Sequence, residues 1–283
     1  MKKIILICLF FIPFSVQAES ELSFNLGLGE DSYKNYSFEL KYSSENYYIS
    51  PGFETYESDY LYKKSVYSLN FGGSFEKYDL DFYISLSPEI DGYKNYSAGA
   101  DLYYSVYDGE DFFIKPGVFL STTWHSDIYS STSAVFYGGK NKTSYSVRTT
   151  PLELKETEYG VSLKAGGNII SGEIYYSKTS YDREISLTDR NIQSMVSEAS
   201  FVAESGFSDY SLGADISSEL GYGFSADMGY VYRTYLLGEK PSKTYKISFS
   251  KNFGSAEPNL SYEYSDDSAG GSSFFGFGLR VKI

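Results

Sequence analysis

Residues 274–283, at the C-terminal end of the chain, read Phe-Phe-Gly-Phe-Gly-Leu-Arg-Val-Lys-Ile. Counting back from Ile283, every second residue is apolar, and the residues between them are glycine or carry a charge. Successive side chains of a strand point to opposite faces, so this period of two predicts a strand with one apolar and one polar face. The same alternation recurs along nearly the whole chain, for example at residues 22–28, 36–42 and 80–86. The pattern therefore predicts an all-β fold.

The N-terminus has the features of an export signal. Lys2 and Lys3 precede an apolar run at residues 4–14, which leads to the small-x-small sequence Val16-Gln17-Ala18. That run is too short for a transmembrane helix, which needs about 20 residues. We therefore expect residues 1–18 to be a signal peptide and residues 19–283 to form a single mature domain. Cleavage would also remove Cys8, the one cysteine of the chain, which excludes a disulfide framework or a thiolate site.

The composition favours a membrane barrel over a soluble sheet protein. A soluble domain could bury an alternating apolar face against a second sheet, but the export signal and the persistence of the alternation favour a face turned to lipid. The mean hydropathy of −0.30 is compatible with this, because strands that alternate score low in any window average. The 31 tyrosines and an aromatic content of 19% fit the aromatic girdles of membrane barrels.

The C-terminal strand also resembles the terminal signature of Gram-negative outer-membrane β-barrel proteins. The residues that carry the resemblance are Phe275, Phe277, Gly278, Leu279, Val281 and Ile283. In that family this strand closes the barrel and is read by the outer-membrane insertion machinery; its usual last residue is Phe, whereas this chain ends on Ile283. The resemblance implies a location in the outer membrane and contact with outer-membrane lipid and lipopolysaccharide.

The number of strands depends on residues 179–207. Alternating segments elsewhere number sixteen, including separate strands at 112–123, 131–138, 142–149 and 157–166. Within residues 179–207, apolar side chains from Ile192 to Ala203 follow a helical stripe, although residues 195–203 could instead form another strand. Bacterial single-chain barrels have an even number of strands. We therefore expect a transmembrane antiparallel up-and-down β-barrel of about sixteen strands, with fourteen as the alternative, and a long loop at 179–207 that can hold a helix.

The face opposite the apolar residues carries ionisable side chains of both signs. An Arg or Lys turned to hydrocarbon at mid-membrane costs about 2–4 kcal/mol, so these groups are expected to line a lumen. A barrel of this width is too wide for its own side chains to fill, which predicts water inside; the alternative is that acids and bases pair and fill a closed barrel. Because the two signs nearly balance, at most a mild cation preference is expected. The predicted lumen residues are Glu39, Lys41, Glu54, Asp79, Asp81, Asp101, Lys115, Arg148, Lys164, Glu173, Asp215, Asp227, Arg233, Lys246, Glu263 and Arg280.

The one histidine lies in the sequence Trp124-His125-Ser126-Asp127. On a strand His125 and Asp127 share a face while Ser126 points away, so a neighbouring nucleophile would be badly placed for its base. The sequence has neither a P-loop nor a dinucleotide fingerprint. We therefore expect no catalytic residues, no metal site and no cofactor. Loss of Lys2 and Lys3 changes the net charge from −13 to −15, which makes nucleic acid an unsuitable partner.

These features together predict a monomeric, porin-like channel of the outer membrane. Small hydrophilic solutes or ions would diffuse passively through its charged lumen, with residues 179–207 as a constriction or lid. The alternative is a structural or binding barrel whose loops contact lipopolysaccharide, a glycan or a partner protein. A third hypothesis is a lipid or peptide hydrolase that uses His125.

Overall fold

The computed structural model describes residues 19–30, 32–58, 63–90, 93–109, 111–136, 143–188, 192, 206–267 and 270–283, and it leaves the side chains of Ile90 and residues 127–152 undescribed. The predicted signal peptide at 1–18 lies outside this description. The strands are β1 (Glu19–Gly29), β2 (Lys34–Ser43), β3 (Tyr47–Glu57), β4 (Lys64–Phe75), β5 (Tyr78–Ile90), β6 (Tyr93–Tyr104), β7 (Tyr107–Asp108), β8 (Phe112–Phe136), β9 (Thr143–Gly167), β10 (Ile170–Tyr181), β11 (Ser208–Gly221), β12 (Phe224–Tyr235), β13 (Ser242–Lys251), β14 (Ala256–Asp266) and β15 (Gly271–Lys282).

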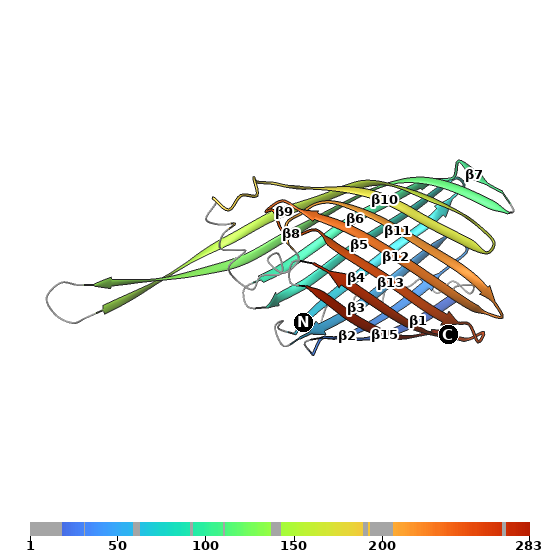
Figure 1. Ribbon diagram of the computed structural model, residues 1–283, viewed down its shortest axis with the longest axis horizontal. Coiled ribbons are helices and arrows are strands. Elements are labelled where there is room, and N and C mark those ends of the chain that lie inside the picture. The colour runs from blue at the N-terminus through green and yellow to red at the C-terminus, as the bar shows by residue number, and fades with distance from the viewer. Residues whose placement is uncertain are drawn as a thin grey trace.

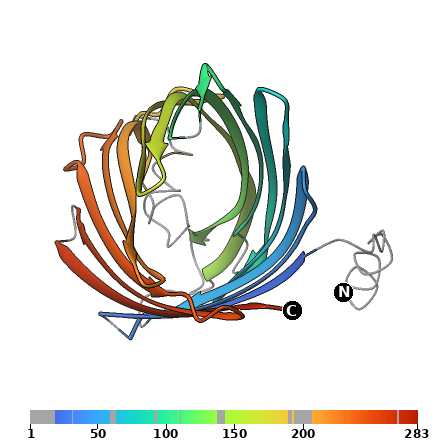
Figure 2. The same ribbon diagram turned by 90° about the vertical axis from the view of Figure 1, so that its right-hand side faces the viewer.

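The strands form one closed antiparallel barrel. Apart from β6 and β7, consecutive strands pair with each other, β1 pairs with β15, and β6 pairs with β8. The two-residue β7 pairs with β8 in the connection between β6 and β8, so fourteen strands make the wall. Figure 2 shows the resulting ring nearly end on. The predicted all-β barrel is confirmed with the alternative count of fourteen strands, and the count of sixteen is wrong.

The two surplus strands of the prediction come from two unusually long strands. β8 and β9 pair without a register shift from Phe112 with Gly167 to Phe136 with Thr143. The predicted strands 112–123 and 131–138 both lie within β8, and the predicted strands 142–149 and 157–166 both lie within β9. In the structure Pro151 is opposite Ile128 in an unbroken ladder, because a proline disturbs only the edge on which its missing N–H would bond.

The outer part of the β8–β9 hairpin extends beyond the barrel wall. The pairing of β6 with β8 ends at Ser126, and that of β10 with β9 ends at Glu156. Among the described residues, the remainder of β8 and β9 forms strand pairs only with each other. Figure 1 shows this hairpin projecting from one end of the barrel, whereas the C-terminus lies at the other end. The hairpin therefore marks the end of the barrel opposite the C-terminus.

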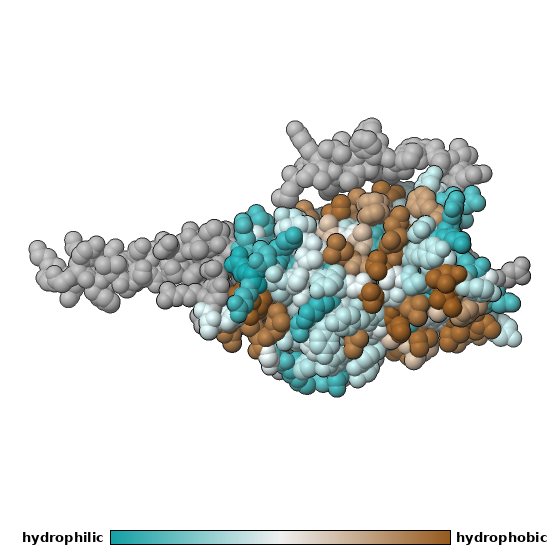
Figure 3. All heavy atoms as spheres, turned by 90° about the horizontal axis from the view of Figure 1, so that it is seen from above, coloured by the Kyte–Doolittle hydropathy of each residue, from teal (hydrophilic) through white to brown (hydrophobic). Residues whose placement is uncertain are grey.

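The burial pattern is inverted relative to a soluble protein. Large apolar side chains at alternate positions are exposed on the outer wall, among them Phe24, Phe38, Ile84, Leu120, Val161, Ile174, Leu212, Phe249, Leu260, Phe275 and Phe277. Brown apolar side chains spread over this wall in Figure 3, with teal hydrophilic ones toward both ends of the barrel. Most of the buried side chains are polar, such as Ser50, Asn95, His125, Ser177 and Ser211. Soluble monomers rarely expose apolar patches beyond a few hundred Å², so the outer wall is suited to lipid.

The segment after β10 is only partly described. Strand β10 includes the first residues of the predicted loop, 179–181, and the next strand begins at Ser208. The helical stripe predicted from Ile192 to Ala203 falls, apart from Ile192, outside the described residues, so the helix stays a prediction. A search of the described residues for helices long and apolar enough to cross a membrane identified none.

Candidate functional site

The interior of the barrel contains a cavity of about 950 Å³. Its wall is formed largely by β13, β14, β15 and β1, whose inward positions carry small polar residues such as Ser248, Ser261 and Asn25. Strand alternation produces this lining, because an inward side chain is followed in the chain by a lipid-facing one. Ser248 is followed by Phe249, and Asn25 is followed by Leu26. Small side chains at successive inward positions leave space that larger ones would fill.

Five of the predicted lumen residues line this cavity. They are Glu54, Asp227, Lys246, Glu263 and Arg280, contributed by five different strands. Four others, Lys41, Asp79, Asp81 and Lys164, line a second cavity of about 280 Å³ near the β2–β3 turn. The structure therefore gathers nine of the predicted residues around two hollows inside the barrel.

Residues on the wall between β5 and β11 are joined by ion pairs and hydrogen bonds. Lys115 Nζ lies 2.8 Å from Asp79 Oδ2, and Lys164 Nζ lies 3.8 Å from Glu173 Oε2. Asp215 is paired in register with Glu173, which places two acids side by side. On this wall acids and bases link β5 with β8 across β6, and β9 with β10, as expected for the alternative of a charge-paired interior.

The remaining predicted residues are held by other contacts or lie outside the described side chains. Asp101 is opposite Asp81 in register, Glu39 accepts a hydrogen bond from Ser50, and Arg233 Nε donates to Ser211 Oγ at 3.3 Å. The side chain of Arg148 belongs to the part of β9 that is not described. The role of the whole set as a pore lining stays a proposal.

Aromatic side chains on the inner wall were missed by the sequence reasoning, which assigned tyrosine to the lipid face. Tyr48 OH donates to Asp81 Oδ1 at 2.7 Å, and Tyr103 OH donates to Glu173 Oε1 at 2.8 Å. The Tyr103 ring also lies 3.6 Å from Lys164 Nζ and packs over Gly117, where a side chain would collide with it. Pairs of adjacent aromatic residues could have indicated these inward side chains. Alternation turns one member of each pair into the lumen, such as Tyr48 in Tyr47-Tyr48.

A small apolar cluster lies toward the hairpin end of the barrel. Tyr93 and Leu154, from β6 and β9, pack with Ile192 and Phe207, and both of the latter are fully buried at 0% exposure. Tyr181, Ile185 and Leu237 pack around this group. We call these seven residues the mouth cluster. Ile185, Ile192 and Phe207 belong to the connection between β10 and β11, so these described residues of the connection pack against side chains of the barrel wall.

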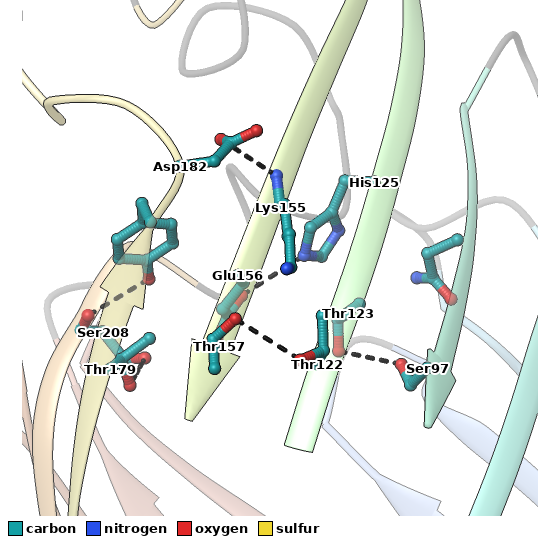
Figure 4. Close-up of polar contacts among 12 residues, drawn as sticks. Ser97, Thr122, Thr123, His125, Lys155, Glu156, Thr157, Thr179, Asp182 and Ser208 are labelled. Carbon is teal, nitrogen blue, oxygen red and sulfur yellow. Dashed lines mark hydrogen bonds and ion pairs between the residues drawn. The ribbon is translucent and has the colours of Figure 1, made fainter. Parts of the chain in front are cut away.

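A polar network adjoins the mouth cluster. His125, 5% exposed, contacts Tyr93 OH through Nδ1 at 2.7 Å and Glu156 Oε2 through Nε2 at 3.2 Å. Asn95 Nδ2 donates to the same tyrosine hydroxyl at 2.8 Å. Figure 4 shows the histidine between β8 and the Glu156 side chain of β9. Both ring nitrogens are thus engaged in contacts that join β6, β8 and β9, an arrangement that anchors Tyr93 beneath the connection.

The network has the geometry of a structural anchor. Ser126, the hydroxyl next in sequence, lies on the other face of β8, and the partners of His125 are a phenol and a carboxylate. A search of the described residues also identified no group of three His, Cys, Asp or Glu side chains placed to hold a metal ion.

Comparison with known proteins shows similarity in structure but not in sequence. No protein-family description and no curated protein matches the chain. Among solved structures, CdiB from Acinetobacter baumannii is similar over 94% of this chain and 60% of its own, at 9% identity and a TM-score of 0.56. The CymD monoaromatic hydrocarbon channel is similar over 94% of this chain and 88% of its own, at 10% identity and a TM-score of 0.51. The KdgM porin is similar over 93% of this chain and 99% of its own, at 9% identity and a TM-score of 0.43. The chain has the closed-barrel fold of outer-membrane porins and related barrel proteins.

Proposed function

We propose that this protein is an outer-membrane channel through which small hydrophilic solutes or ions diffuse passively. The observation that carries the proposal is the cavity of about 950 Å³ inside a barrel whose outer wall is apolar. A wall with this distribution of side chains separates water inside from lipid outside. The similarity to the CymD channel supports the fold on which the proposal depends.

The width of the barrel supports an open lumen. A barrel of eight strands is just filled by its own side chains, whereas one of sixteen to eighteen strands encloses an aqueous channel. Fourteen strands are close to the wider class. On the side of β13–β1 the inward positions carry serine, asparagine and glycine, including Ser248, Ser261 and Gly276, and these leave the interior hollow.

The connection between β10 and β11 would set the size limit of the channel. Its residues Ile192 and Phe207 are packed against Tyr93 and Leu154, which belong to the barrel wall. A segment fixed inside the mouth reduces the cross-section that a solute can use, as the sequence analysis expected for residues 179–207. The free path then lies toward β13, β14, β15 and β1, where the cavity is found.

Export, insertion and assembly belong to the same proposal. Residues 1–18 would direct secretion and be removed. The insertion machinery would read the outward side chains of β15, of which Phe275 is 63% and Phe277 46% exposed. The inward Gly278 lies next to the Asn25 and Asn259 side chains, which leave no room for a side chain at this position. The mature chain would work as a monomer in contact with outer-membrane lipid and lipopolysaccharide.

A solute-permeation assay tests the function. Liposomes that contain refolded residues 19–283 are expected to swell in iso-osmotic small sugars, at rates that fall as the sugar becomes larger. Replacing the cavity-lining Ser261 by tryptophan should slow swelling severalfold, since the indole would fill part of the lumen. The matched control is Leu260→Trp, one residue earlier on the lipid face, which should swell like wild type. An inserted wild-type barrel that causes no swelling would contradict the proposal.

The projecting hairpin favours a second candidate, a barrel whose outer elements bind lipopolysaccharide, a glycan or a partner protein. Residues 127–136 and 143–152 pair with each other beyond the end of the barrel wall. This length exceeds what closure of the barrel requires. Shortening the hairpin to the wall should abolish such binding and leave swelling unchanged. Binding that survives this deletion would contradict the second candidate.

A further inference from the structure

The cavity on the β13–β1 side carries an unequal charge. Five carboxylates line it, namely Glu54, Glu219, Asp227, Glu257 and Glu263, against the two basic groups of Lys246 and Arg280. Two of these acids, Glu219 and Glu257, were not among the predicted lumen residues. The lining therefore carries a formal charge of −3, whereas the sequence had suggested a near balance of the two signs.

One basic group of the cavity is engaged in ion pairs, and the other lies opposite an acid. Arg280 Nε lies 2.9 Å from Glu21 Oε1, and its Nη1 lies 3.2 Å from Glu257 Oε1. This arginine is fixed against the wall by two carboxylates on both neighbouring strands. Lys246 is directly opposite Glu263 in the β13–β14 register, which places opposite charges next to each other. Of the two positive charges, that of Arg280 is therefore already shared with carboxylates of the wall.

Two acids of the lining are held by neutral donors instead. Ser248 Oγ donates to Asp227 Oδ2 at 3.0 Å, and Asn35 Nδ2 donates to Glu54. A hydroxyl or an amide orients a carboxylate without cancelling its charge. Both carboxylates, on β12 and β3, face the same cavity from different parts of the wall. A cation that crosses the cavity would meet their field on more than one side.

We infer that the channel selects cations, with Asp227 and Glu54 as its specificity-determining residues; this rests on the proposed function, because selectivity requires an open lumen. Charges of one sign in a cleft with low-dielectric walls focus the field and concentrate the opposite ion. Rings of Asp and Glu act in this way in cation channels. The ligand class is small hydrated cations, such as K⁺ and small protonated amines, which pass along the side of the lumen away from the mouth cluster.

The zero-current potential of inserted channels in a tenfold KCl gradient tests the inference. Wild type is expected to make the dilute side positive, with K⁺ several times more permeant than Cl⁻. The double variant Asp227→Asn with Glu54→Gln should lower that ratio toward one, and Asp227→Lys with Glu54→Lys should favour Cl⁻. The control is Glu76→Gln, which removes a charge from the exposed β4–β5 turn and should keep the wild-type ratio.

The outcomes separate the two levels of the proposal. Conducting wild-type channels that favour Cl⁻ or show no preference would overturn the selectivity and leave the channel function standing. Equal ratios for wild type and the charge-reversed variant would overturn the assignment to Asp227 and Glu54. A silent bilayer that holds inserted protein would overturn the proposed function, and the selectivity with it.

Discussion

Replacing Leu260 by arginine is expected to lower the free energy of unfolding in lipid by about 2–4 kcal/mol, the cost of an arginine on the lipid face at mid-membrane. Leu260 is 62% exposed on the outer wall, near the middle of β14. Its neighbours across the strands are Phe249 and Phe277, so the site lies within the apolar surface. Equilibrium unfolding in urea with the chain in phospholipid vesicles measures the change, and Trp124, the one tryptophan, reports it by fluorescence.

The matched control is Ser261→Arg, one residue further along the same strand. Ser261 lines the cavity, where water can hydrate a guanidinium, so its replacement should change the free energy of unfolding by less than about 1 kcal/mol. Equal losses for the two variants would show that β14 does not separate lipid from water, and the assignment of its two faces would then be wrong.

Truncation of Phe207 to alanine is expected to raise single-channel conductance by releasing the connection between β10 and β11 from the lumen. Removal of a buried Phe side chain costs about 3–5 kcal/mol. Phe207 precedes β11, so this loss falls on the docking of the connection and not on the strand ladder. A change of this size shifts the balance between docked and undocked states by more than about 100-fold. Conductance histograms of wild type and variant give the measurement.

Leu236→Ala provides the control for this variant. Leu236 is 42% exposed, and its backbone N–H donates to the Phe207 carbonyl at 2.8 Å, a bond that alanine keeps. Its conductance should match that of wild type, and both variants should keep the resistance of the folded barrel to detergent. Unchanged conductance for Phe207→Ala would mean that the mouth cluster does not limit the path.

The fold could be predicted to a large extent because the residues of each barrel strand alone indicate which of its faces is turned to lipid. Alternation at residues 22–28 or 274–283 fixes which side chains face lipid, and this depends on no distant contact. The number of strands was harder to predict, because the residue at which a strand ends depends on whether a neighbouring strand continues to pair with it. The predicted breaks at residues 124–130 and 150–156 lie within unbroken strands, and only the pairing of β8 with β9 shows that no turn forms there.

The sequence could predict which residues face the interior, but not which of them contact one another. Parity along the strands identified inward residues such as Asp227 and Glu263, and the structure supplied their distribution around two cavities. The pairing of Arg280 with Glu21 and Glu257 joins residues far apart in the chain, since β15 lies between β1 and β14. The cluster that joins Phe207 with Tyr93 is equally nonlocal, so a constriction by residues 179–207 could be proposed from the sequence, but its packing partners could not.

Single-channel recording of refolded residues 19–283 in a planar bilayer tests the central claim, an open water-filled lumen, most directly. The cavity inside the wall predicts discrete current steps of reproducible size that rise in proportion to KCl concentration. Protein shown by its urea-unfolding transition to be folded and inserted, yet silent at every salt concentration, would contradict the account. The search would then turn to what the outer hairpin of β8 and β9 binds.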